Sequence, residues 1–201
     1  MSIYALKPRF QALLRPLVGG LHAAGVTANQ VTLAACAASV GLGLALYALP
    51  LAPAWFALVP LWMFVRMACN AVDGMLAREY GQQTRLGALL NELTDVLSDA
   101  ALYLPFARLA PLDPFWIGAI VLLAALAEFA GALGPTIGAA RRYDGPMGKS
   151  DRACVFGALG LWAALAGGLP DWSAWLLPVF AGLTAWTIVN RIRHALAQAQ
   201  E

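Results

Sequence analysis

Long apolar segments, separated by short stretches rich in polar residues, proline or glycine, occupy most of the chain. A segment of about 20 predominantly apolar residues crosses the hydrocarbon core of a bilayer as a single α-helix. Six such spans are predicted, at about residues 28–49, 54–78, 86–109, 115–140, 153–169 and 173–190. The pattern therefore predicts an all-α integral membrane protein. It has one membrane domain over residues 1–201, with a bundle of six transmembrane helices between about 28 and 197.

The first residues follow a different pattern, typical of an amphipathic helix between about residues 3 and 22. Its apolar stripe comprises Ile3, Leu6, Phe10, Leu13, Leu14, Leu17 and Leu21. Lys7, Gln11 and Arg15 form the opposite stripe. We expect an interfacial helix on the cytoplasmic leaflet, with its basic face toward anionic lipid. A cytosolic helix packed against protein is the alternative.

Composition and the distribution of charge support a membrane protein and indicate its orientation. Of the 201 residues, 61% are hydrophobic and 12% are charged, about half the charged share of a soluble domain. The connections near residues 49–53, 110–114 and 168–172 contain no Lys or Arg, whereas the termini and the other connections are basic. The positive-inside rule then places both termini in the cytoplasm. We expect a multi-pass protein of a bacterial-type inner membrane, surrounded by membrane lipid and without a nucleic-acid partner.

Carboxylate and amide side chains interrupt the second and third spans at regular intervals. Asn70 and Asp73 lie three residues apart, and Asn91, Asp95 and Asp99 lie four apart. These spacings place each group on one face of a helix, so a helical hairpin would bring the two faces together. Oxygen ligands gathered in this way suit Mg²⁺ or Mn²⁺.

The same hairpin carries a motif of fixed spacing. Residues 70–95 read N-x2-D-G-x2-A-R-x8-G-x3-N-x3-D. This segment resembles the signature of the CDP-alcohol phosphotransferases, integral membrane enzymes that make phospholipid head groups. Their pattern is D-x2-D-G-x2-A-R-x8-G-x3-D-x3-D, and a match that keeps every spacing is far more specific than a lone glycine motif. The chain is identified as a member of a bacterial branch with Asn at the first and third acidic positions, here Asn70 and Asn91.

The resemblance implies an enzyme that transfers a phosphatidyl, or another substituted phosphate, group from a CDP-alcohol such as CDP-diacylglycerol to an alcohol acceptor. CMP is released, and Asp95 occupies the position of the general base. The implied ligands of one or two Mg²⁺ or Mn²⁺ ions are Asp73, Asp95, Asn70 and Asn91, with Glu92 and Asp99 as substitutes. The implied nucleotide-binding residues are Asn29, Thr32, Gly74, Ala77, Arg78 and Gly87. The family also implies a homodimer.

Charged residues outside the motif supply further candidates. Arg66, within the second span, lies on the motif face and is a charge partner for the motif carboxylates. Glu128, within the fourth span, could pair with Arg66 or with a donor on another helix. The connection before the fifth span is basic and suits an acceptor that bears a phosphate, although positive-inside topology accounts for part of its charge. Its cations are Arg141, Arg142, Lys149 and Arg152.

Two other functions remain open from the residues alone. Asn70 and Asn91 remove two negative charges from the site, so a catalytically silent CDP-lipid-binding membrane protein is the main alternative. A small transporter is a third reading, motivated by Arg66, Asp99 and Glu128 within the spans. The enzyme is favoured because neither transport nor silent binding explains the fixed motif.

Overall fold

In the computed structural model, which describes residues 6–50 and 52–199, the chain folds into helices and short connections, without a strand in that part. Its α-helices are α1 (Leu6–Ala23), α2 (Ala28–Ala48), α3 (Leu58–Glu79), α4 (Arg85–Tyr103), α5 (Pro114–Ala132), α6 (Lys149–Ala166) and α7 (Leu176–Ala199). Short 3₁₀ turns also occur, namely η2 (Pro53–Ala57), η3 (Leu104–Arg108), η4 (Gly134–Ile137) and η5 (Asp171–Trp175). The prediction of an all-α protein therefore holds for the described residues.

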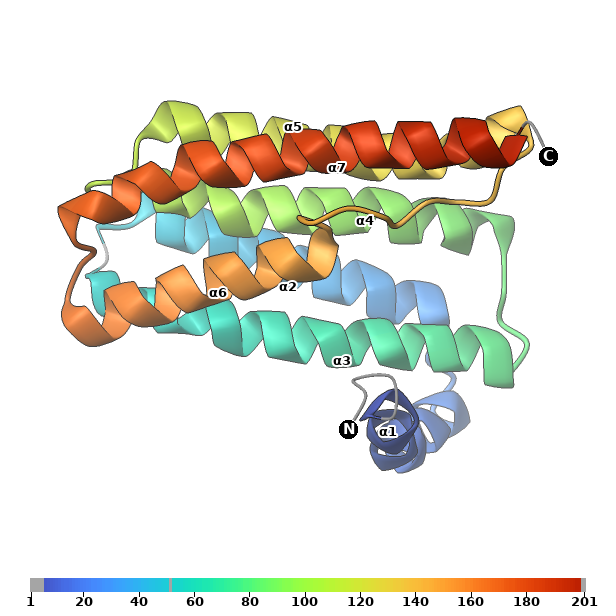
Figure 1. Ribbon diagram of the computed structural model, residues 1–201. Coiled ribbons are helices and arrows are strands. Elements are labelled where there is room, and N and C mark those ends of the chain that lie inside the picture. The colour runs from blue at the N-terminus through green and yellow to red at the C-terminus, as the bar shows by residue number, and fades with distance from the viewer. Residues whose placement is uncertain (1–5, 51, 200–201) are drawn as a thin grey trace.

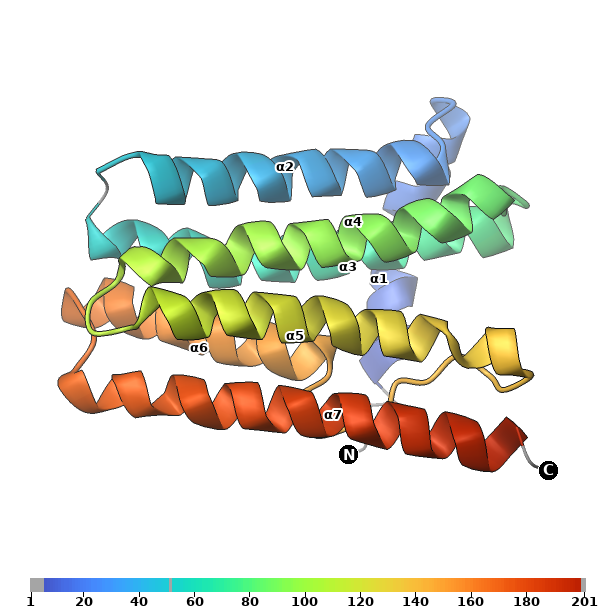
Figure 2. The ribbon, with the colours of Figure 1, turned by 90° about the horizontal axis from the view of Figure 1, so that it is seen from above.

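Helices α2 to α7 run side by side along one direction, and α1 lies across them against α3 (Figures 1 and 2). The α3–α4 connection, the segment between α5 and α6, and the end of α7 lie at one end of the bundle, on the right in both views. The connections that contain the stretches without Lys or Arg lie together at the opposite end. The charge asymmetry of the sequence is thus an asymmetry between the two ends of the bundle.

Four helical segments of the described residues are long and apolar enough to cross a membrane. They are Ala28–Ala48, Pro53–Glu79, Pro114–Ala132 and Asp171–Ala199. Large apolar side chains more than half exposed on the outside of the bundle include Leu44, Phe64, Phe115, Phe129 and Leu165. Such a surface fits lipid better than water. The chain is accordingly a multi-pass membrane protein.

The other two helices of the predicted six-span bundle, α4 and α6, carry more charge than the four apolar segments. α4 contains Arg85, Glu92, Asp95 and Asp99, and α6 begins with Lys149, Asp151 and Arg152. Both helices nevertheless lie among the four apolar ones (Figure 2). Asp99 and Arg152 are buried inside the bundle, whereas Arg85 and Asp151 are exposed. Length and composition alone support four of the six predicted spans.

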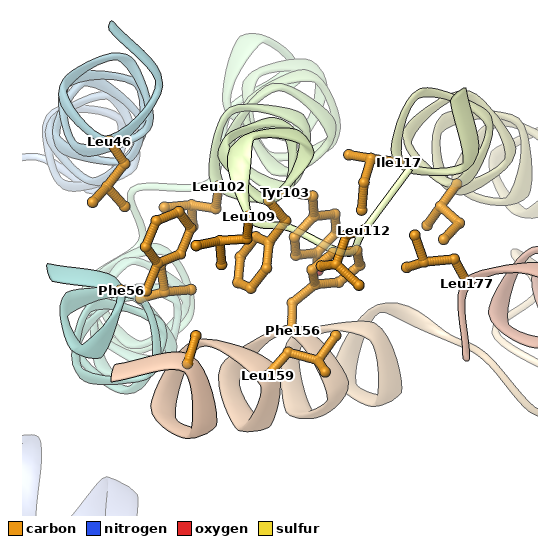
Figure 3. Close-up of a cluster of buried hydrophobic side chains, with 14 of the residues drawn as sticks. Leu46, Phe56, Leu102, Tyr103, Leu109, Leu112, Ile117, Phe156, Leu159 and Leu177 are labelled. Carbon is orange, nitrogen blue, oxygen red and sulfur yellow. The ribbon is translucent and has the colours of Figure 1, made fainter. Parts of the chain in front are cut away.

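The main hydrophobic core lies in the half of the bundle that is distant from the motif, and Figure 3 shows its labelled side chains packed together. It joins the ends of α2 and α4 to the beginnings of α5 and α7 through side chains such as Leu46, Leu102, Ile117 and Leu177. The ring of Phe156 on α6 stacks on Tyr103 with 4.1 Å between centroids. Since this half is closed by apolar packing, the polar residues of the spans are left to the other half.

One predicted helix end differs clearly from the structure. The fourth span was expected to reach about residue 140, but α5 ends at Ala132. Gly134 and Pro135 begin a 3₁₀ turn there, and Gly138 adopts a left-handed conformation with φ of 83°. The chain then returns to the helix end, where the Arg142 amide donates to the Gly131 carbonyl at 3.1 Å. Pro135 lacks an amide hydrogen for the helix, and Gly138 has a left-handed backbone, so these two residues outweigh the apolar pattern here.

The remaining boundaries shift in a way that matters for the site. α6 begins at Lys149, four residues earlier than expected, and α7 continues to Ala199 rather than ending near residue 190. Lys149, expected in a connection, and Arg191, expected beyond the last span, are therefore helical.

Helix α1 lies within the range predicted near the chain start, and residues 3–5 of that range lie outside the described residues. Val18 packs with Val72, Met75 and Leu76 of α3. The Arg15 guanidinium pairs with Glu79 at 3.1 Å. Leu13 is nevertheless 75% exposed, so part of the apolar face of α1 is not covered by the rest of the protein. Its place at the lipid interface stays a prediction.

Candidate active site

A cavity of about 860 Å³, the larger cavity, opens where α2 begins, α3 ends and α4 begins. It is lined by the four main metal-ligand candidates and the six nucleotide-binding candidates. These are Asn70, Asp73, Asn91 and Asp95, and Asn29, Thr32, Gly74, Ala77, Arg78 and Gly87. Glu92 also faces it, as do Gln82, Gln83, Thr84 and Arg85, which the sequence did not single out. The three- and four-residue spacings did bring the two faces of the hairpin together, as expected.

Helix caps fix the walls of this cavity. The Thr27 hydroxyl accepts a hydrogen bond from the Gln30 amide and begins α2, and the Thr84 hydroxyl accepts one from the Gly87 amide and begins α4. The Gln82 side chain accepts a hydrogen bond from the Ala28 amide at 2.8 Å, which ties the α3–α4 connection to the start of α2. Threonine at both starts thus holds the two helix N-termini around one space.

Two motif glycines make room for neighbouring polar side chains. A Cβ atom at Gly87 would lie 2.7 Å from the Asn29 side-chain oxygen. A Cβ atom at Gly74 would lie 2.8 Å from an Arg78 guanidinium nitrogen. Any larger residue would push Asn29 or Arg78 away, so both glycines set the positions of cavity donors.

Asp73 is held by a single polar neighbour from another helix. Its carboxylate accepts a hydrogen bond from the Thr32 hydroxyl at 2.8 Å and is only 7% exposed. Among the described residues, Asp73 forms no salt bridge. No cation of the described residues is therefore paired with this carboxylate on the cavity wall.

Asp95, in contrast, lies between two cations. Arg66 donates to its Oδ1 at 3.0 Å and to its backbone carbonyl at 3.1 Å, while Lys149 pairs with Oδ2. Arg66 also pairs with Asp99, which is buried and lies outside the larger cavity. Of the partners considered for Arg66, the structure selects Asp95 and Asp99. Asp99 is placed to hold Arg66 rather than to face the cavity.

Glu128 gathers a second group of cations deeper in the bundle. Its carboxylate pairs with Arg152 at 2.8 Å, with Arg191 at 3.3 Å and with Arg141 at 3.5 Å. Glu128 is thus the partner of cations other than Arg66. Arg191 is 1% exposed, and it is not a sequence candidate because it lies beyond the predicted end of the last span. The missed signal was the continued helical pattern of residues 192–199.

The four cations of the basic connection divide into two pairs. Arg141 and Lys149 face a smaller cavity of about 350 Å³, and Arg141 pairs with Glu92 as well as with Glu128. Arg142 and Arg152 line neither this nor the larger cavity. Burial lowers the pKa of Arg141, yet a guanidinium remains a cation at neutral pH. The cations predicted as one phosphate pocket therefore lie in different surroundings.

The donors that face the larger cavity fit a divalent cation by their chemistry. Two carboxylates and two amides, those of Asp73, Asp95, Asn70 and Asn91, supply the oxygen ligands that Mg²⁺ and Mn²⁺ prefer. Within residues 6–50 and 52–199, no three His, Cys, Asp or Glu side chains form a metal-binding group by themselves. A cation in the cavity would need the amide oxygens or substrate phosphate oxygens as additional ligands.

Comparison with known proteins gives a consistent result. A family model described as CDP-alcohol phosphatidyltransferase matches residues 25–187. The chain is 48% identical over 204 residues to the inner membrane protein YnbA of Escherichia coli strain K12, with 100% of both chains covered. It is 38% identical over 103 residues to the phosphatidylinositol phosphate synthase of Mycolicibacterium smegmatis, over 51% of this chain and 45% of that one.

Solved structures of the phosphatidylinositol phosphate synthase of Mycobacterium tuberculosis share the fold. The structure with CDP-DAG bound has a TM-score of 0.76 at 22% identity and covers 92% of this chain and 96% of that one. The structure in complex with manganese and citrate has a TM-score of 0.76 at 21% identity and covers 92% and 91%.

Proposed function

This chain belongs to the CDP-alcohol phosphatidyltransferase family, and we propose that it transfers a phosphatidyl or related substituted phosphate group from a CDP-alcohol such as CDP-diacylglycerol to an alcohol, with release of CMP. The family identified from the spaced motif is confirmed. The observation that carries the proposal is that the motif residues and the start of α2 line one cavity at the basic end of the bundle.

The reaction forms a bond between the acceptor oxygen and the β-phosphorus and breaks the bond between that phosphorus and the oxygen of CMP. The acceptor hydroxyl must lose its proton, and Asp95 is the proposed base. Arg66, with one bond to the Asp95 carbonyl and one to its carboxylate, fixes the orientation of that group. Arg78, folded over Gly74, offers a forked donor to the diphosphate.

The proposed cofactor is Mg²⁺ or Mn²⁺, as one or two ions, held by Asp73 and Asp95 with the amide oxygens of Asn70 and Asn91. When bound, such an ion neutralises the diphosphate and the charge that develops on the leaving CMP. Thr32 keeps Asp73 oriented toward the cavity by its hydrogen bond. Glu92 is a less suitable substitute ligand, because Arg141 already pairs with it.

The proposal extends to the arrangement in the membrane. α4 and α6 cross the bilayer with the four apolar segments, which gives six spans, and the basic end of the bundle faces the cytoplasm. Both termini are then cytoplasmic, as expected for an enzyme of the inner membrane whose cavity must receive soluble acceptors. A homodimer remains an expectation from the family.

The test is release of CMP from CDP-diacylglycerol by the purified protein, with and without Mg²⁺ or Mn²⁺, against a set of candidate alcohols. Metal-dependent release that requires one alcohol supports the transferase and identifies the acceptor. Asp95→Asn is expected to lower turnover by about 10²-fold or more, the usual contribution of a general base, while CDP-diacylglycerol still binds.

Asp113→Asn is the matched control, since Asp113 caps α5 at the opposite end of the bundle. It should leave turnover near the wild-type rate. Binding of CDP-diacylglycerol by the wild-type protein without CMP release, with any alcohol or metal, would identify a catalytically silent lipid-binding protein instead. Turnover retained by Asp95→Asn would remove Asp95 as the base.

A further inference from the structure

The smaller cavity, of about 350 Å³, borders the larger one and shares Asn91 and Asp95 with it. None of the proposed nucleotide-binding residues lines it. An acceptor alcohol must reach Asp95 from a space that the nucleotide does not fill. Under the proposed function, on which this inference rests, the smaller cavity is that space.

Each cation that lines the smaller cavity already has a carboxylate partner. Arg141 pairs with Glu92 and Glu128, and Lys149 pairs with Asp95. Arg191 pairs with Glu128 at 3.3 Å and also donates to the Ala127 carbonyl. Every cation of the lining therefore has at least one carboxylate partner, although the Arg141 Nε has no hydrogen-bond partner among the described residues.

Carboxylates balance these cations in the lining itself. Asp95, Glu128 and Asp151 face the same space as Arg141, Lys149 and Arg191. The side chain of Asp151 accepts a hydrogen bond from the Gly148 amide at 2.9 Å, and Glu128 is 7% exposed. The cavity wall thus carries no net charge, and it offers acceptor and donor atoms in similar measure.

The two remaining cations of the basic connection are committed elsewhere. Arg142 forms a two-bond pair with Asp144, at 2.8 and 3.1 Å, and its hydrogen bonds lower the pKa of that carboxyl. Arg152 is 1% exposed and donates to Glu128 and to the Met147 carbonyl. Neither lines the smaller cavity.

From this pairing we infer that the acceptor alcohol carries no phosphate and no net negative charge. A phosphate monoester brings close to two negative charges. It would have to break ion pairs and face the carboxylates Asp95, Glu128 and Asp151, and both are unfavourable in a partly buried space. An uncharged polyol hydrogen-bonds to the same wall without displacing any pair. The acceptor class differs from the phosphate-bearing acceptor that the basic sequence suggested.

The test compares matched alcohols with and without phosphate, namely glycerol with glycerol 3-phosphate and inositol with inositol phosphate, in CMP release from CDP-diacylglycerol. Mg²⁺ is present at the same concentration throughout. A divalent cation bound by Asp95 would weaken the ion pair between Asp95 and Lys149, so all alcohols must be compared with the same metal. The unphosphorylated member of the productive pair is expected to have a kcat/KM at least about tenfold higher, since charge-assisted pairs must otherwise be broken. Higher activity with the phosphorylated member would overturn the inference and leave the transferase intact.

Other outcomes separate the inference from the proposed function. CMP release with a different alcohol that lacks phosphate, such as serine, also supports the inference. If no alcohol leads to CMP release, the proposed transferase activity is contradicted, and the inference about its acceptor is contradicted as well.

Inorganic phosphate as an inhibitor gives a second readout on the same cavity. Glu92→Gln removes one partner of Arg141, so its inhibition constant for phosphate is expected to fall by about tenfold relative to the wild type. The matched control is Glu79→Gln, because Glu79 pairs with Arg15 and lines neither cavity. Wild-type protein inhibited by phosphate as strongly as Glu92→Gln would show that Arg141 is free to bind anions, against the inference.

Discussion

At the scale of single residues, Arg66 decides how the proposed base is presented. It is 5% exposed, and its guanidinium spans Asp95 on the cavity wall and Asp99 behind it. A planar fork can satisfy both carboxylates at once, which a lysine cannot do with the same geometry. Arg66 also competes with any divalent cation for the Asp95 carboxylate. Its effect on the reaction is therefore exerted through Asp95, as a positioning residue.

Arg66→Leu is expected to destabilise the protein by about 3 kcal/mol, because it leaves two buried carboxylates without their shared partner. The same change should strengthen Mn²⁺ binding, since a competing cation is removed, while kcat falls. Mn²⁺ titration followed by electron paramagnetic resonance, together with thermal unfolding in detergent, measures both effects.

Arg108→Leu is the control, because Arg108 donates to the Tyr47 carbonyl at the other end of the bundle. It should leave Mn²⁺ affinity unchanged. An Arg66→Leu protein with wild-type Mn²⁺ affinity would return Arg66 to a purely structural role. Arg66→Lys, which keeps the charge without the fork, should recover stability better than turnover.

At the scale of helices, the close packing of α2 on α4 aligns the two sides of the larger cavity. Gly43 makes this packing possible, since a Cβ atom at that position would overlap the Ala101 carbonyl. This contact between Gly43 and Ala101 lies in the half of the bundle that the apolar core fills. We expect it nevertheless to set the distance between Thr32 and Gly87 at the other end of the bundle. Helices behave as rigid rods over this length, so a shift at one end is felt at the other.

Gly43→Leu is expected to separate α2 from α4 and to cost about 1–3 kcal/mol or more, the usual cost of overpacking. CDP-diacylglycerol affinity should fall with stability, because Asn29 and Thr32 move relative to α4. Gly41→Leu is the matched control on the same helix, since nothing lies within 4 Å of a Cβ atom there. Equal melting temperatures for the two variants would contradict the proposed alignment.

At the scale of the whole molecule, apolar packing and charge are segregated along the bundle axis. The core cluster occupies one half, and the carboxylate and guanidinium groups of α3 to α7 occupy the other. Buried ion pairs are costly unless every group is paired, and here they pair across helices. One end of the bundle therefore contains the cavities and the charged side chains, and the other end is closed by apolar packing. The positive-inside rule predicts that the end with the cavities faces the cytoplasm.

Single cysteines in a background without Cys36, Cys69 and Cys154 test this orientation. Membrane-impermeant maleimide added to the periplasmic side should label Ala110→Cys and Asp171→Cys but not Glu79→Cys or Arg193→Cys. Ala110 and Asp171 are exposed in the connections that lack Lys and Arg. Glu79 is the last residue of α3 and Arg193 lies near the end of α7, at the basic end. The reverse labelling would invert the orientation, and labelling of Glu79→Cys and Ala110→Cys from one side would exclude a crossing by α4.

Much of the cavity could be predicted from the sequence because its residues lie on two neighbouring helices joined by a short connection. The helical period fixes which side chains share a face, and a hairpin forces the two faces together. That is why Asn70, Asp73, Asn91 and Asp95 line one space, and why the motif identified the family. The positions of Thr32 and Arg78 followed from the same resemblance.

The pairing of the charges was decided only by the tertiary structure. Whether Lys149 meets Asp95, or Glu128 meets Arg152 rather than Arg66, depends on how far each helix is rotated and shifted along its axis relative to its neighbours. No local period encodes those offsets, because they arise from the packing of side chains across several helices. The sequence by itself therefore determined the fold class, the family and the motif residues that face the larger cavity, but not Gln82, Gln83, Thr84 or Arg85. The three-dimensional packing determined which carboxylate each cation pairs with, and this pairing is the basis for the inferred class of acceptor.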